Sequence, residues 1–263
     1  MAYKPDIVLS PSCPNAPRRS VYATPATGKL RLWTQQPIAA ARALESGDTY
    51  FSKPDFEKDW DEGPDSYWSF RQAYAWMADR MAERIGPPPP GVEHPVWAWA
   101  RPPITTKSGA PDLRSMRETG EPKALIELLV DPCGTLISDH SSWHHVLNRL
   151  PLGLSEAESD LMDRRLCAIA ERSDGIQREN SLLLPKDFSD PDVVAELSRG
   201  WLRIFEVGPI LPGIPVKMAY TDPYDCDWIS DDNIAVQACL WLIEPGQLVS
   251  WRPVIPAPPR KIK

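Results

Sequence analysis

The sequence predicts an α+β fold: a single domain in which a mixed or antiparallel sheet is flanked by helices. Three observations support this prediction. Strand-like and helix-like apolar segments both occur, but without the regular alternation of a doubly wound parallel fold. Hydrophobic residues make up 42% of the 263 residues and charged residues 25%, so the chain can bury a large core. Neither an internal repeat nor a long linker interrupts residues 29–251.

Strands are predicted where apolar or alternating residues lie between turn signals. In the second one, Trp97 and Trp99 fall two residues apart, which places both rings on one face of the sheet. The fourth follows the turn sequence Asp131-Pro132-Cys133-Gly134. The predicted strands cover residues 30–34, 96–99, 124–130, 135–137 and 234–243.

Helices are predicted where apolar residues recur every three or four positions. Gly47 and Gly86 are expected to end the first two helices, Asp139 to cap the third, and a Ser155–Glu158 capping box to open the fourth. The fifth begins near residues 189–191. The predicted helices cover residues 38–44, 67–85, 139–150, 155 to about 169, and about 190–205.

Both ends of the chain differ from the middle. Residues 1–28 are predicted to form a proline-rich arm and residues 252–263 a proline- and lysine-rich tail. The first residues do not resemble a signal peptide, and no apolar run approaches the ~20 residues needed to span a bilayer. We therefore expect a soluble, cytoplasmic protein with no membrane partner.

Charge and cysteine content exclude several classes of function. The net charge of −7 disfavours passive binding to a nucleic-acid backbone, which requires a basic face. The five cysteines are scattered, with no C-x-x-C pair, so they predict reduced thiols and neither a disulfide framework nor a zinc ribbon. Phosphate-loop, G-x-S-x-G and H-E-x-x-H motifs are absent from the sequence.

One predicted helix carries an unusual polar stripe. His140, His144 and Asn148 are spaced by four residues, so they share one side of the helix. The stripe is either a proton-transfer or metal site, or an ordinary solvated face. Its spacing supplies too few ligands for zinc, and no metal is expected. Asp139, just before it, is either a helix cap or a site residue at a strand-to-helix corner.

Other polar residues are candidates for ligand contact. Arg114 lies in a loop with further basic residues, where its guanidinium could bind a phosphate or remain solvated. Gln237 lies within the apolar segment IAVQACLWLI, so its amide needs a partner. Thr34 and Gln36, near the end of the first strand, also carry side-chain polar groups that need partners.

Several segments together resemble an uncharacterised bacterial family of domains of unknown function. They are LRLWTQQP, FRQAYAWM, HPVWAWA, PDLR, LIELLVDPCGTLISDHSSWHHVLN, GWLRIF and VQACLWLIEP, and the resemblance covers roughly residues 30–251. More distantly, the order of strands resembles ADP-ribosyltransferases that modify DNA or RNA. In that superfamily three strands place an Arg or His, an aromatic or polar residue, and a Glu around NAD.

The resemblance implies positions for these groups in this chain. Thr34 stands where the His is expected, with Arg31 nearby, and Gln237 or Cys239 stands near the expected Glu, while Glu244 lies at the strand end. The implied catalytic residues are Thr34, Asp139 and Gln237. The implied NAD contacts are Arg31, Gln36, Arg114, Trp97, Trp99 and His144.

Three hypotheses follow. The first is an NAD-using transferase-like domain of a toxin or defence protein, with a nucleotide ligand and a macromolecular acceptor. The second is a non-catalytic module that binds a nucleotide or a protein, because Gln237 cannot act as a carboxylate and exposed Trp97 and Trp99 would form an aromatic platform. The third is an unrelated enzyme that uses the histidine stripe. The first requires Thr34, Asp139 and Gln237 to share one cleft.

Overall fold

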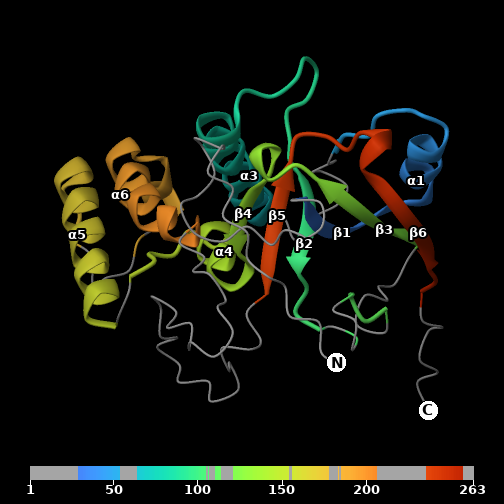
Figure 1. Cartoon of the computed structure of the whole chain (residues 1–263). Helices are drawn as coiled ribbons and strands as arrows, with labels where there is room; N and C mark the ends of the chain where they lie inside the picture. Colours follow the sequence, from blue (N-terminus) through green and yellow to red (C-terminus); the bar gives the residue numbers. More distant parts are fainter. Residues whose placement is uncertain are drawn as a thin grey trace, which may run out of the picture.

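The computed structural model describes residues 29–53, 64–104, 106, 110–113, 121–153, 156–177, 183, 185–205 and 235–256. Within these ranges, six strands form one sheet in the order β4-β5-β2-β1-β3-β6, and every neighbouring pair is antiparallel (Figure 1). The predicted α+β class is confirmed, with an antiparallel sheet. The strands are β1 (Leu30–Pro37), β2 (Val96–Arg101), β3 (Lys123–Val130), β4 (Leu136–Asp139), β5 (Val236–Leu240) and β6 (Leu248–Val254).

The helices of the described residues are divided between the two faces of the sheet. One helix, α1, contributes Ala41 and Leu44 to the core on the first face. Three others, α3, α4 and α6, pack on the second face, and α5 packs on α6 at the β4 end of the sheet (Figure 1). The helices are α1 (Ile38–Glu45), α3 (Pro64–Ile85), α4 (His140–Leu147), α5 (Glu156–Asp174) and α6 (Pro191–Trp201).

The strands in the middle of the sheet are buried on both faces. All five residues of β5 are buried. Ala238 and Leu240 enter the core beneath α1, whereas Cys239 enters the core beneath α3, α4 and α6. Successive side chains of a strand point to opposite faces, so a strand with a core on each side must be apolar throughout. This explains why the sequence around β5 shows a continuous apolar run.

Local sequence signals set the ends of several elements. The Asp139 carboxylate accepts a hydrogen bond of 2.9 Å from the backbone N–H of Ser142, which confirms its predicted capping role at α4. Gly47 after α1 has a φ of +94° and Gly86 after α3 has a φ of +98°. These left-handed conformations favour glycine, and they end both helices where expected.

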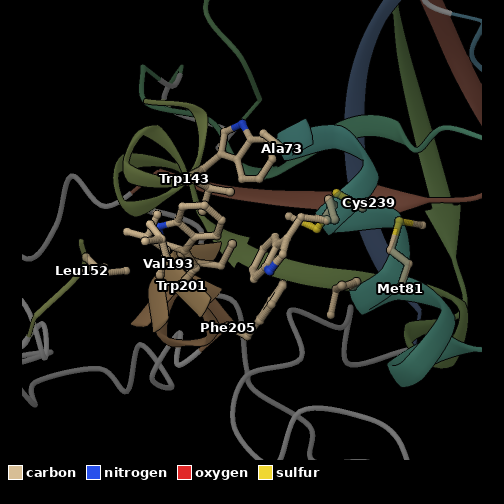
Figure 2. Packing of buried hydrophobic residues seen from close by; sticks show 14 of the residues in the cluster. Ala73, Met81, Trp143, Leu152, Val193, Trp201, Phe205 and Cys239 are labelled. Carbon is tan, nitrogen blue, oxygen red and sulfur yellow. The ribbon is translucent and has the colours of Figure 1, made fainter. Parts of the chain in front are cut away.

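Aromatic side chains form much of the core on the second face. The Trp76 ring of α3 lies edge-on to Trp201 at 5.7 Å and stacks on Phe205 at 5.8 Å. Phe205 belongs to a 3-10 turn, Leu202–Phe205, that continues α6. Figure 2 shows Trp201 and Phe205 in one cluster with Ala73 and Met81 of α3. The indole N–H of Trp201 also donates a 2.8 Å hydrogen bond to the Leu150 carbonyl, which ties α6 to the chain after α4.

The structure differs from the sequence-based prediction at the end of the domain. β6 was not expected, yet it pairs with β3 over most of its length and reaches Val254, inside the segment predicted as a tail. Pro253 and several exposed residues hide this strand in the sequence, because an edge strand tolerates both. The predicted N-terminal arm and Ser155 of the predicted capping box lie outside the described residues.

The cysteines of the described residues are of two kinds. Cys167 and Cys239 are buried free thiols, as expected, whereas Cys133 is exposed and disulfide-bonded, which corrects the expectation of reduced thiols throughout. Burial raises the pKa of the Cys239 thiol well above its usual value. Within the described ranges, helices long and apolar enough to cross a membrane are absent.

We predict that Leu128→Ala lowers the free energy of unfolding by about 2–5 kcal/mol, because Leu128 is fully buried in β3 and its truncation leaves a cavity. Leu161→Ala is the matched control: this leucine of α5 is 40% exposed, and its truncation should cost less than about 0.5 kcal/mol. Urea denaturation followed by circular dichroism measures both values. Equal losses at the two positions would contradict the assignment of the core.

Candidate functional site

Thr34 and Gln36 belong to a chain of hydrogen bonds that links β1 to its surroundings. The Tyr50 hydroxyl donates to Oε1 of Gln36 at 2.7 Å, and Nε2 of Gln36 donates to Oγ1 of Thr34 at 2.8 Å. The Thr34 hydroxyl donates in turn to the Trp97 carbonyl at 2.6 Å. Burial raises the pKa of Tyr50 above its usual value, which keeps its hydroxyl protonated as the donor. These hydrogen bonds satisfy side-chain polar groups of Thr34 and Gln36, so both candidate residues have a structural role in the sheet.

Gln237 lies on the opposite face of the sheet. In the strand ladder it is directly across from Trp99 on one side and Ser138 on the other, and Trp99 is directly across from Trp33. Directly opposed residues share a face, so Gln237 lies on the face of Trp33, whereas Thr34, the next residue, points to the other face. Thr34 and Gln237 therefore do not share one cleft.

The Gln237 amide has its partner within the sheet. Its Nε2 donates a hydrogen bond of 3.1 Å to Oγ of Ser138 on β4, and both side chains are buried. The interaction meets the expectation that an amide inside an apolar strand needs a partner. It also joins the two strands at the β4 edge of the sheet.

Asp139 lies at the corner between β4 and α4. Burial raises the pKa of its carboxyl, while hydrogen bonds from the backbone N–H groups of Ser142 and Ser141 and the charge of His145 act in the opposite direction. The Asp139 carboxylate therefore caps the first turn of α4. Of the two roles suggested by the sequence, helix cap and site residue, the structure shows the helix cap.

Arg31, one of the two arginines proposed as NAD contacts, is not brought to this corner. Arg31 forms an ion pair with Glu127 of β3, and Glu127 also accepts a 3.0 Å hydrogen bond from the Ser250 hydroxyl. The Arg31 guanidinium is thus paired with a carboxylate of β3, away from β4 and the Asp139 corner. Arg114 lies outside the described residues.

Trp97 is part of the core beneath the helices. Its ring lies 5.5 Å from Tyr74 of α3 and 4.8 Å from Trp143 of α4. Its indole N–H is buried and lacks a hydrogen-bond partner among the described residues. Trp97 and Trp99 do share a face, as predicted from their spacing, but Trp97 does not contribute to an exposed platform.

Trp99 instead begins a row of three rings. The Trp99 ring lies 4.8 Å from His140, and the His140 ring lies 4.9 Å from His144, edge-on. Trp99 and His140 are half-buried and His144 is exposed, so the ring row runs from the sheet to the surface. Asn148, the third residue of the predicted stripe, donates to the His144 carbonyl at 2.7 Å and helps to end α4.

The electrostatics favour a neutral His140 in the middle of the ring row. Burial and the neighbouring His144 lower the pKa of His140 to about 4. At neutral pH its imidazole is therefore uncharged, with one nitrogen that donates and one that accepts. Within the described residues, groups of three or more His, Cys, Asp or Glu side chains that could hold a metal ion are absent.

The structure thus brings together only part of the expected site. Trp99 and the buried Gln237 share one face of the sheet, and Trp99 leads through His140 to His144. The partner of Gln237, Ser138, was not assigned to a site from the sequence. His140 was visible as part of the histidine stripe, but its contact with Trp99 depends on how α4 follows β4. Glu244 and Cys239 contribute no group here, since Glu244 caps a 3-10 turn and Cys239 is fully buried.

Comparison with known protein families agrees with the first resemblance. Residues 31–248 match the family described as Domain of unknown function (DUF3841). The chain belongs to this family. No curated protein and no solved structure matches it. The match covers β1 to the start of β6, and so includes both the ring row and the hydrogen-bond chain of Thr34.

We predict that Thr34→Val lowers the free energy of unfolding by about 1–3 kcal/mol. The two side chains have nearly the same shape, but valine leaves the Trp97 carbonyl and the Gln36 amide without their partner. Thr106→Val is the control, because Thr106 is exposed. Urea unfolding measures both, and a neutral Thr34→Val would show that the hydroxyl is not needed for stability.

A second prediction concerns pH. The pKa of His140 is about 4 in the folded protein and near 6.5 in an unfolded chain, so between these values the unfolded chain binds more protons. The contribution of neutral His140 is therefore complete above pH 6.5 and is lost as the pH falls toward 4. The free energy of unfolding of the wild type should fall between pH 7.5 and 5 more steeply than that of His140→Asn. Parallel pH profiles would contradict it.

Proposed function

We propose that this protein is a non-catalytic module that binds a planar, nitrogen-containing ring of the nucleotide kind on the ring row. The observation that carries the proposal is the sequence of contacts Trp99–His140–His144, at 4.8 Å and 4.9 Å, from a buried strand to an exposed helix surface. Exposed aromatic side chains stack nucleobases with about 1–3 kcal/mol per base, and His144 is the exposed ring at the outer end of the row.

The chemistry of the surface supports recognition by stacking and hydrogen bonding. Neutral His140 offers a ring nitrogen as donor or acceptor without the cost of burying a charge. Gln237 and Ser138 hold the strand beside Trp99 through their mutual hydrogen bond. Nicotinamide and adenine are both planar nitrogen-containing rings, so NAD stays within the proposed class of ligand.

Binding without turnover fits these side chains better than transfer chemistry. An imidazole with a pKa of about 4 is a weak base and scarcely protonated near neutrality, whereas an efficient acid–base group has a pKa close to the working pH. Gln237 supplies no carboxylate, and Thr34 points to the other face of the sheet. Asp139 is held by the first turn of α4. Among the described residues, the groups on which the transferase hypothesis rests therefore do not converge.

Calorimetric titration with NAD and with AMP tests the proposal. We predict that Trp99→Ala and His144→Ala each weaken binding about tenfold, which corresponds to the loss of one stacking contact. Ser141→Ala is the matched control, because Ser141 is also exposed on α4 but takes no part in the ring contacts. Equal affinity of Trp99→Ala and the wild type would disprove the assignment, as would no binding of either ligand.

Incubation of the wild type with labelled NAD and cell extract separates binding from transfer. We expect no label on any macromolecule. Transfer that disappears in Gln237→Ala would instead support the transferase hypothesis and contradict a non-catalytic module.

A further inference from the structure

A groove lined with arginines lies between α5 and α6, away from the ring row. Its volume is about 570 Å³, within the range of roughly 300–1,000 Å³ that is common for small-molecule sites. The side chains that line it come from both helices and from the start of the 3-10 turn after α6. Its charged residues are Arg165, Arg172, Arg199, Arg203, Glu158 and Glu196.

The charges in the groove are not balanced. Four arginines face two glutamates, which leaves an excess of two positive charges in a chain whose net charge is −7. Arg203 forms an ion pair with Glu158 and also donates to the Leu152 carbonyl at 2.9 Å. This arginine is therefore committed to holding the 3-10 turn after α6 to α5 and to the loop before α5.

Two of the remaining arginines lie beside a single carboxylate. Glu196 pairs with Arg199, and Arg165 lies 3.9 Å from the same carboxylate. The side chains of Arg165 and Arg199 remain 60% and 71% exposed, and Arg172 is also exposed and pairs with none of the described carboxylates. Arg165 and Arg199 thus share one carboxylate and Arg172 lines the same groove, so N–H donors of all three guanidinium groups are available to an anion.

Helix geometry directs these groups into the groove. Arg165 and Arg172 are seven residues apart, so they lie on the same side of α5 about 10 Å apart along its axis. Met162 and Ile169 add apolar side chains to the lining. At Gly200 of α6 a Cβ would lie 2.5 Å from the Met162 methyl group and 3.2 Å from the Leu152 carbonyl oxygen, so the glycine fits a tightly packed position. The groove therefore combines apolar and cationic side chains.

We propose that this groove binds a small molecule that carries two or more phosphate groups. Guanidinium groups bind phosphate oxygens through paired, charge-assisted hydrogen bonds, and several of them match several phosphates. A protein partner fits less well, because a standard interface buries about 800 Å² on each side and the groove is the size of a small molecule. The site is independent of the ring row, whose residues belong to β2 and α4.

Tripolyphosphate is the probe, because it supplies the anionic groups without a base that could bind the ring row. Isothermal titration calorimetry is carried out on the full chain, and the Arg165→Ala/Arg172→Ala double variant should bind at least tenfold more weakly than the wild type. Higher ionic strength should weaken wild-type binding, since the contacts are between exposed charges. Citrate tests whether carboxylates replace phosphates, and we expect it to bind more weakly.

The control is Arg42→Ala/Arg252→Ala, which removes the same charge from exposed positions on α1 and β6, at the opposite end of the sheet (Figure 1). Its affinity for tripolyphosphate should match that of the wild type. Thermal unfolding of each variant checks that the fold is retained, as expected for exposed side chains. Equal loss of tripolyphosphate affinity in both double variants would show that only net charge matters and would overturn the proposal. Unchanged affinity of Arg165→Ala/Arg172→Ala, or no binding by the wild type, would also overturn it.

Discussion

The alternation of side chains along strands that are buried on both faces is the constraint on which the rest of the structure depends. In β5, Ala238 packs beneath α1 and Cys239 packs beneath the helices of the other face. A shift of one residue in the pairing of any central strand would exchange these two sets of side chains. The same pleat separates Thr34 from Gln237, since the first points to one core and the second to the other. Fold and site geometry are therefore fixed by one physical rule.

Polar groups inside this sheet are matched by short, local hydrogen bonds. Thr34, Gln36 and Tyr50 form one chain on the first face, and Gln237 with Ser138 forms a pair on the second. A buried polar group without a partner would cost about 1–3 kcal/mol, so these contacts offset a real penalty. Thr34 and Gln237, which resemble part of a catalytic set, thus have a structural role as hydrogen-bond partners inside the sheet.

The surfaces suited to ligands lie where helices meet the sheet or each other. The ring row forms because α4 follows β4 directly and brings His140 against Trp99 of β2. The arginine groove forms because α5 and α6 pack closely across Gly200, leaving cationic side chains along the seam. One surface is aromatic and neutral at His140, and the other is cationic within an acidic protein. They accordingly select different chemical groups.

The sequence by itself determined the α+β class, most of the helices and strands, the Asp139 cap, the glycines that end α1 and α3, and the family. These features depend on periodicity and on local backbone preference, which are properties of neighbouring residues. It could not reveal β6, whose proline and exposed residues are allowed only because it is an edge strand, nor which candidate residues meet. The order of strands in the sheet decided that Thr34 and Gln237 lie on opposite faces, and helix packing brought together Trp99 with His140 and Arg165 with Glu196. Such contacts join residues far apart in the chain, and only tertiary packing sets them.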